Sequence, residues 1–219
     1  MDNPSIFQQQ PEGPAATEHI AQLYRNNAEL AHVVGDFIVE GLRRGEAVLV
    51  IATAAHWALF VSRLARYADI DLAGAIVNGQ LRIMDAELAL AAIMADNLPQ
   101  WHHVHQRAKE IIESCSRRYG TLRVYGEMVN LLWSKENRVG AEMLEGHWNA
   151  IAHRYPVRRL CAYRMEEEDG ENYNALLRCV CRTHARVLPP PGRPDTRKQC
   201  ESGRRGGGAG SIGSVAIEL

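Results

Sequence analysis

The sequence lacks several features that would place a protein in a familiar class at once. Its net charge is −1, so charge gives no indication of binding to nucleic acid or to an anionic membrane. No stretch approaches the roughly 18 apolar residues that a membrane span requires. The N-terminal segment has no basic start and no apolar run, unlike a signal peptide. These absences predict a cytoplasmic protein that acts neither directly on nucleic acid nor at a membrane.

The cysteines and the missing hydrolase motif exclude further classes. The chain has five cysteines, an odd number, and their spacing does not resemble a disulfide framework, which predicts free thiols in a reducing compartment. Cys179 and Cys181 would point away from each other on a helix, so they cannot share a metal ion there. No Gly-x-Ser-x-Gly elbow of a serine hydrolase is present.

What the chain does contain is a regular alternation of strand-like and helix-like segments. Ala47–Ala52 is apolar at every position, which predicts a strand buried on both faces. His19–Tyr24 alternates apolar and polar residues, which predicts a strand with one buried face. The other predicted strands are Leu81–Asp85, Thr121–Glu127 and Arg158–Arg164, with an edge strand possible at Ala185–Leu188. Helical patterns lie between them, including one expected to run over Ala86–Ala95.

This alternation predicts a single α/β domain with three layers. Strands alternating with helices favour a mainly parallel central sheet, here of about five strands, covered by helices on both faces. The domain is expected to span residues 18–188. Residues 1–17 are polar and contain three prolines, so we predict a disordered leader. Residues 189–219 are rich in proline, glycine and arginine, so we predict a disordered tail.

The turn after the strand Ala47–Ala52 is the first candidate site. In α/β folds such a strand-to-helix junction often binds phosphate through backbone N–H groups and the helix N-terminus. A working phosphate loop needs glycines and a lysine, and the junction Thr53–Trp57 has neither. Thr53 can cap the following helix, and His56 can point into a ligand cleft. The junction therefore predicts either a site for another anion or small polar group, or simply a packed turn.

Glu127 is the second candidate, because it is the last residue of the predicted strand of residues 121–127. Ligands of open α/β sheets bind beyond the carboxyl ends of the strands, where Glu127 should lie. A carboxylate there can coordinate a metal, act as a base or accept a hydrogen bond from a ligand. The alternatives are a salt bridge to Arg123 or Arg164, or a cap on the helix that begins at Met128.

Histidines and cysteines elsewhere predict no metal site and no cofactor. His19 begins the first predicted strand and His184 ends the last predicted helix, and both are expected to be structural. Cys115 and Cys161 fall on apolar faces and are expected to be small core residues.

Several segments together resemble the MEDS domain, the methanogen/methylotroph sensory domain of a dichloromethane-responsive repressor. The resemblance covers roughly residues 17–188, in order and with ordinary spacings. The segments are His19-Ile-x-x-x-Tyr24, Gly41-Leu-x-x-Gly-Glu46-x-Val-Leu-x-Ile51, Leu122-Arg-x-x-Gly-Glu-Met128-x-x-Leu-Leu-Trp133, Leu144-Glu-x-x-Trp148-Asn149, and Leu160-Cys-x-Tyr163 with a later Cys181-x-x-His184.

The resemblance implies a RecA/KaiC-like fold that has lost the phosphate loop and senses small molecules. Such domains are often fused to histidine kinase, anti-sigma or DNA-binding modules. The part of this chain after residue 188 is too short for such a module. We therefore expect either that the output goes to a regulatory partner, such as a histidine kinase or a sigma-factor regulator, or that the chain is a truncated or stand-alone member.

We therefore predict a non-catalytic sensory domain that binds a small molecule at the carboxyl edge of the sheet. Glu127 would be the polar anchor, and His56, Trp57, Tyr24 and Tyr163 would be walls of the site. Two alternatives are a degenerate nucleotide-binding enzyme that uses Glu127 as a base, and a protein-interaction module with no ligand.

Overall fold

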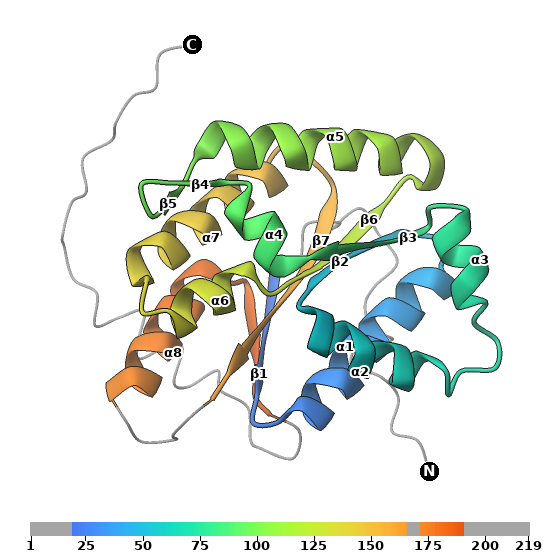
Figure 1. Cartoon of the computed structure of the whole chain (residues 1–219), viewed down its shortest axis with the longest axis horizontal. Helices are drawn as coiled ribbons and strands as arrows, with labels where there is room; N and C mark the ends of the chain where they lie inside the picture. Colours follow the sequence, from blue (N-terminus) through green and yellow to red (C-terminus); the bar gives the residue numbers. More distant parts are fainter. Residues whose placement is uncertain (1–18, 166–170, 191–219) are drawn as a thin grey trace.

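A computed structural model describes residues 19–165 and 171–190 (Figure 1). The predicted leader, residues 1–17, and nearly all of the predicted tail, residues 189–219, lie outside the described residues. No helix in the described part is long and apolar enough to cross a membrane.

The central sheet has six strands, and every neighbouring pair is parallel. The order across the sheet is β3-β2-β6-β7-β1-β8. The strands are β1 (His19–Tyr24), β2 (Ala47–Ala52), β3 (Leu81–Asp85), β6 (Leu122–Gly126), β7 (Val157–Arg164) and β8 (Arg186–Leu188). All five predicted strands are present, and the possible edge strand is the sixth.

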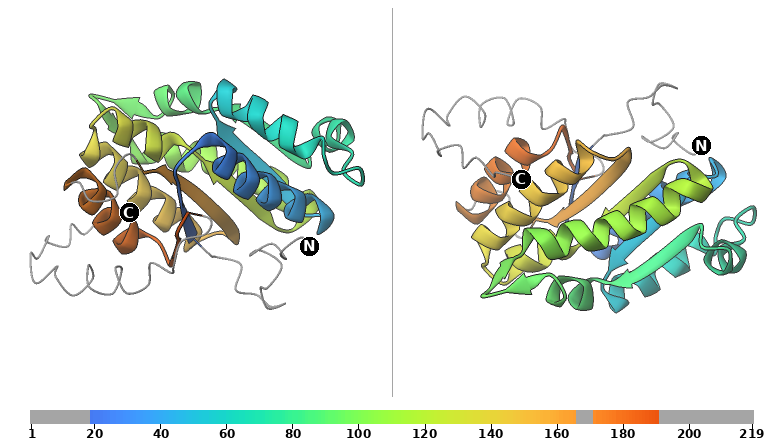
Figure 2. Two further views of the ribbon diagram at one scale, coloured as in Figure 1. Left: turned by 90° about the horizontal axis from the view of Figure 1, so that it is seen from below. Right: turned by 90° about the horizontal axis from the view of Figure 1, so that it is seen from above.

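Helices cover both faces of this sheet (Figures 1 and 2). One face packs against α1 (Asn27–Arg43), α2 (Ala54–Leu64) and α3 (Leu72–Val77). The other packs against α4 (Ala86–Ala91), α5 (Trp101–Tyr119), α6 (Met128–Ser134), α7 (Arg138–Ala152) and α8 (Glu171–Thr183). The buried apolar residues form two clusters, one on each side of the sheet. This three-layer arrangement is consistent with a RecA-like domain and confirms the predicted fold.

The predicted helix over Ala86–Ala95 is too long. The helix α4 ends at Ala91, and a small antiparallel hairpin follows, formed by β4 (Met94–Ala95) and β5 (Leu98–Pro99). Asp96 and Asn97 connect its strands with φ angles of 50° and 63°. Positive φ at both residues of a two-residue turn suits a hairpin and is tolerated best by Asn, Asp and Gly, so these residues end the helical pattern.

The prediction of one buried face for β1 is wrong, because all six of its residues are buried. The strand lies between β7 and β8, with helices on both sides. Its polar side chains are accommodated by hydrogen bonds. Gln22 donates to the backbone oxygens of Leu23 and Pro189, at 2.7 and 2.8 Å. Alternation of polar and apolar residues therefore did not indicate exposure here.

The prediction of free thiols needs one correction. Cys115, Cys161 and Cys179 are free and buried, whereas Cys181 is disulfide-bonded. Burial raises the pKa of the Cys179 thiol to about 12, so this thiol is protonated at neutral pH.

Candidate functional site

The junction between β2 and α2 has the geometry of a capped helix N-terminus. Thr53 has extended backbone angles and is the N-cap of α2, as predicted. Its hydroxyl accepts a hydrogen bond from the backbone N–H of His56, at 3.3 Å. This bond satisfies one of the helix donors that a bound anion would otherwise meet.

The junction between β6 and α6 lies directly beside it. Strands β2 and β6 are hydrogen-bonded neighbours, and Ile51 is opposite Gly126. The backbone N–H of Glu127 donates to the carbonyl oxygen of Ile51 at 3.0 Å. The two stretches that the sequence singled out separately therefore form one carboxyl-edge site.

The Glu127 carboxylate joins the two junctions, and only 3% of the residue is exposed. Its Oε2 accepts a hydrogen bond from the backbone N–H of Thr53 at 3.0 Å. Its Oε1 accepts from the Tyr125 hydroxyl at 2.9 Å and from Nδ1 of His56 at 2.9 Å. We call these four residues the Glu127 clamp. In the described part of the chain, Glu127 forms no salt bridge with Arg123, which pairs with Glu46, and none with Arg164. Glu127 lies at the N-cap position of α6, but its side chain makes no capping hydrogen bond there.

Of the remaining predicted site residues, Tyr24 is the one that the structure brings close to the clamp. Burial first, and then the negative charge of the Glu127 carboxylate, raise the pKa of Tyr24 to about 12. Trp57 is half-buried on α2 and packs on the cluster under α1 to α3. Tyr163 lies on the opposite face of the sheet, where its hydroxyl donates to Glu145 on α7. His56 and Tyr24 thus accompany Glu127, and Tyr163 does not.

The clamp places a carboxylate where a nucleotide-binding protein would hold a phosphate. The N–H of Thr53, at the start of α2, is already bonded to Glu127 Oε2. A second anion at this point would have to displace the carboxylate or lie against its negative charge. The local geometry therefore favours an internal contact over phosphate binding.

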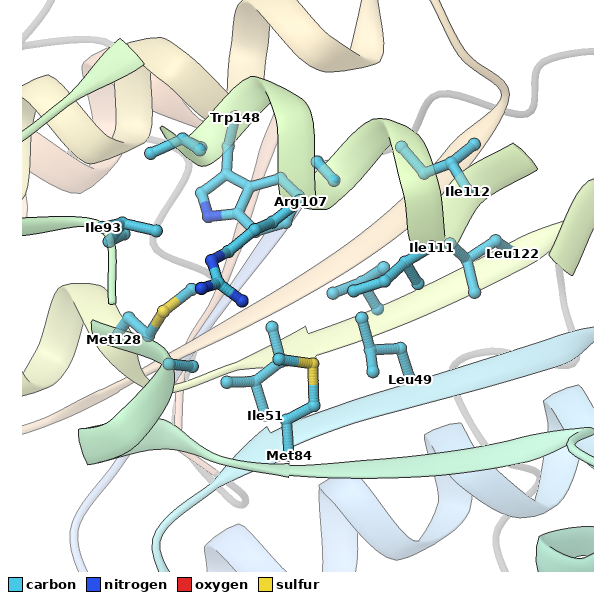
Figure 3. Close-up of a pocket in the computed structure, with 14 residues that line it drawn as sticks. Leu49, Ile51, Met84, Ile93, Arg107, Ile111, Ile112, Leu122, Met128 and Trp148 are labelled. Carbon is cyan, nitrogen blue, oxygen red and sulfur yellow. The ribbon is translucent and has the colours of Figure 1, made fainter. Parts of the chain in front are cut away.

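An apolar cavity lies under α5, on the face of the sheet that α4 to α8 cover (Figure 3). It encloses about 40 Å³. Figure 3 shows the side chains of Leu49, Ile51 and Met84 pointing from the sheet towards α5. Arg107 is the one charged residue among those that line it. The lining residues are Leu49, Ile51, Met84, Ala89, Ile93, Val104, Arg107, Ala108, Ile111, Ile112, Leu122, Val124, Met128 and Trp148.

Sequence reasoning missed this cavity. Val104, Ala108 and Ile111 recur at helical spacing in the sequence of α5, which indicates one apolar face. Whether such a face leaves a void depends on the summed volumes of side chains from seven helices and strands, which periodicity does not report. Met128, a wall of the cavity, is adjacent to Glu127 in the sequence, so cavity and clamp are one residue apart.

The chain matches the model of a known protein family. A family model described as "MEDS: MEthanogen/methylotroph, DcmR Sensory domain" matches residues 18–185. This range contains every element from β1 to α8. No curated protein matches the chain.

Proposed function

Because the chain belongs to the MEDS family of sensory domains, we propose that it senses a small apolar molecule bound in the cavity under α5. The observation that carries this proposal is the lining, which is apolar except for Arg107. Small-molecule sites are concave and mostly apolar with few polar groups. A void lined by Leu, Ile and Met stays dry, so an apolar molecule of matching size gains contacts there without displacing bound water.

The Glu127 clamp is our proposed link between the cavity and the surface. A ligand that displaces Met128 acts on the start of α6, where Glu127 holds Thr53 and His56. His56 is partly exposed, with 19% of its side chain accessible. Binding would shift the population between two arrangements of this junction and so alter a surface that a partner reads. From the family resemblance, that partner is a regulatory protein such as a histidine kinase or a sigma-factor regulator.

The clamp is also a second candidate site for the ligand itself. Within the described residues, Glu127 Oε2 accepts a single hydrogen bond, from Thr53, and a carboxylate oxygen can accept two. A ligand with a polar end can therefore use Glu127 as an anchor, with His56, Trp57 and Tyr24 around it. This alternative differs from the first in requiring a hydrogen-bond donor on the ligand.

Val124→Ile should weaken binding of a small apolar probe. The substitution keeps a β-branched residue in β6 and adds one methylene to the wall of a cavity of about 40 Å³. We expect dichloromethane to raise the melting temperature of the wild type and to raise that of Val124→Ile less. Val139→Ile adds the same methylene at a residue on α7 that is 63% exposed, and should respond like the wild type.

Glu127→Gln tests the clamp with a second probe, methanol, because dichloromethane has no hydroxyl or N–H group to donate to a carboxylate. If the ligand site is the cavity under α5, the response of Glu127→Gln to either probe should be close to that of the wild type. A dichloromethane response that Val124→Ile leaves unchanged would contradict the cavity, and a saturable methanol response that Glu127→Gln diminishes would favour the clamp.

The alternative of a degenerate nucleotide-binding enzyme predicts binding of a magnesium–nucleotide complex. We expect none, because the Thr53 N–H is engaged by Glu127 and the junction lacks glycine and lysine. Titration calorimetry with millimolar MgATP and MgGTP should give only heats of dilution. Saturable heat that depends on magnesium would instead support the enzyme.

A further inference from the structure

A second cluster of polar side chains lies on the α7–α8 face of the sheet, apart from the cavity and the clamp. It contains His19 on β1, Cys161 on β7, Glu145 on α7 and His184 after α8. All four residues are buried, and none is more than 8% exposed. One nitrogen, sulfur or oxygen atom from each lies within 4.8 Å of the corresponding atoms of the others.

We propose that these four side chains bind a divalent transition-metal ion, for which zinc is the best fit. Two imidazole nitrogens, a thiolate and a carboxylate are all zinc ligands, and four of them complete a tetrahedral site with no open position. Such a closed site is structural or regulatory rather than catalytic. It would connect β1 and β7 to α7 and to the end of α8.

The distances suit a small cation. Nε2 of His19 lies 3.3 Å from Sγ of Cys161 and 3.5 Å from Oε2 of Glu145. Nε2 of His184 lies 3.5 Å from Oε1 of Glu145. Zinc bonds of about 2.0–2.3 Å place neighbouring ligand atoms of a tetrahedron about 3.3–3.8 Å apart. The cluster therefore needs little rearrangement to close around an ion.

The orientation of both imidazoles points to metal binding. Nδ1 of His19 lies 3.1 Å from the side-chain oxygen of Asn149, and Nδ1 of His184 lies 3.0 Å from the backbone oxygen of Val180. Because these oxygens only accept hydrogen bonds, each Nδ1 carries the proton and each Nε2 presents a lone pair to the cluster. Metal-binding histidines are typically fixed in this way by a second hydrogen bond.

The carboxylate of Glu145 supplies the independent observation. It is fully buried, and within the described part of the chain its Oε2 makes no hydrogen bond of ordinary geometry; the nearby donor that interacts with this carboxylate is the Cys161 thiol, itself a member of the cluster. The Nε2 lone pair of His19 faces this oxygen. Two acceptors at 3.5 Å repel each other unless a proton or a cation lies between them. A bound ion removes this repulsion and releases the proton of the Cys161 thiol to solvent.

Asn149 and a surface pocket complete the arrangement. Asn149 donates to the backbone oxygen of Thr183 at 3.1 Å, which turns its side-chain oxygen towards His19. Nη1 of Arg159 donates to this side-chain oxygen of Asn149 at 3.3 Å. The pocket beside the cluster is lined in part by His19, Asn149 and His184, so an ion can enter from the surface.

The test is metal binding by the full chain. We expect the wild type to bind one zinc ion per chain by mass spectrometry, with cobalt giving the visible bands of a tetrahedral site and a near-ultraviolet thiolate band. Cys161→Ser should lose the thiolate band, and His184→Gln should weaken binding by more than about 100-fold, beyond the effect of an outer-shell change. Asn149→Ala, which removes only a positioning residue, should weaken it by about 10–100-fold.

Cys115→Ser is the matched control, since Cys115 is a free thiol that is 1% exposed and lies outside the cluster. Its cobalt spectrum should equal that of the wild type. A folded wild type that takes up neither zinc nor cobalt would overturn the proposal, whatever the variants do. So would a thiolate band that persists in Cys161→Ser. The result does not depend on whether an apolar ligand binds under α5.

Discussion

Glu127→Ala is expected to lower the free energy of unfolding by about 2–4 kcal/mol. The substitution removes the acceptor for the Tyr125 hydroxyl, the Thr53 N–H and His56 at once. Tyr125 is fully buried, so water cannot reach its hydroxyl to replace the lost acceptor. A buried donor left without a partner costs about 1–3 kcal/mol. Chemical denaturation followed by circular dichroism measures the loss.

Two further variants make this prediction specific. Glu127→Gln keeps an acceptor oxygen and the side-chain length, so its loss should be smaller than that of Glu127→Ala. Glu113→Ala removes a carboxylate whose side chain is 45% exposed, and should change stability by less than about 0.5 kcal/mol. A loss below about 1 kcal/mol for Glu127→Ala would mean that the carboxylate is not a structural clamp. That result would favour the role of Glu127 as a hydrogen-bond acceptor for a ligand over its role as a structural link between the cavity and the surface.

For the clamp, the sequence predicted the positions of the strand ends but not the partners of Glu127. The end of β2 at Ala52 was predicted from an apolar run, the end of β6 at Gly126 was predicted one residue late, at Glu127, and parallel strands bring their carboxyl ends to one edge. The chemistry of Glu127 was not predictable, because its partners depend on the strand order. The sheet places β6 next to β2, which brings Thr53 and His56 within reach and leaves Arg123 and Arg164 elsewhere. Periodicity reports which residues are buried, not which strands are neighbours.

The same limit explains why His19, Cys161 and His184 were each expected to be structural, and why Glu145 was not singled out. Each residue alone is an ordinary buried side chain on its own element. They come together because β1 lies next to β7, with Ala21 opposite Cys161, and because α7 and α8 pack on that face. The segments that carried the family resemblance contained all four residues, but nothing in their spacing showed that they share one site.

Arg123→Met is expected to lower the free energy of unfolding by about 3–5 kcal/mol. Arg123 is 1% exposed, and its Nε donates to Oε2 of Glu46 at the start of β2. Its guanidinium also lies over the ring of Phe37, 5.3 Å from the centroid. Methionine retains much of the volume but leaves the Glu46 carboxylate, which is 9% exposed, without its ion pair. An uncompensated buried charge is the main source of the loss.

The double variant Arg123→Met/Glu46→Gln tests that cause, because it removes both charges. A buried ion pair replaced as a whole is often nearly neutral, so the double variant should recover to within about 1.5 kcal/mol of the wild type. Arg182→Met breaks an exposed pair with Glu142 and should change stability by less than about 0.5 kcal/mol. A double variant no more stable than Arg123→Met would assign the loss to packing on Phe37 instead. Because the Arg123 side chain packs on Phe37 of α1, on the face of the sheet opposite the cavity, the double variant should bind dichloromethane as the wild type does, which separates stability from sensing.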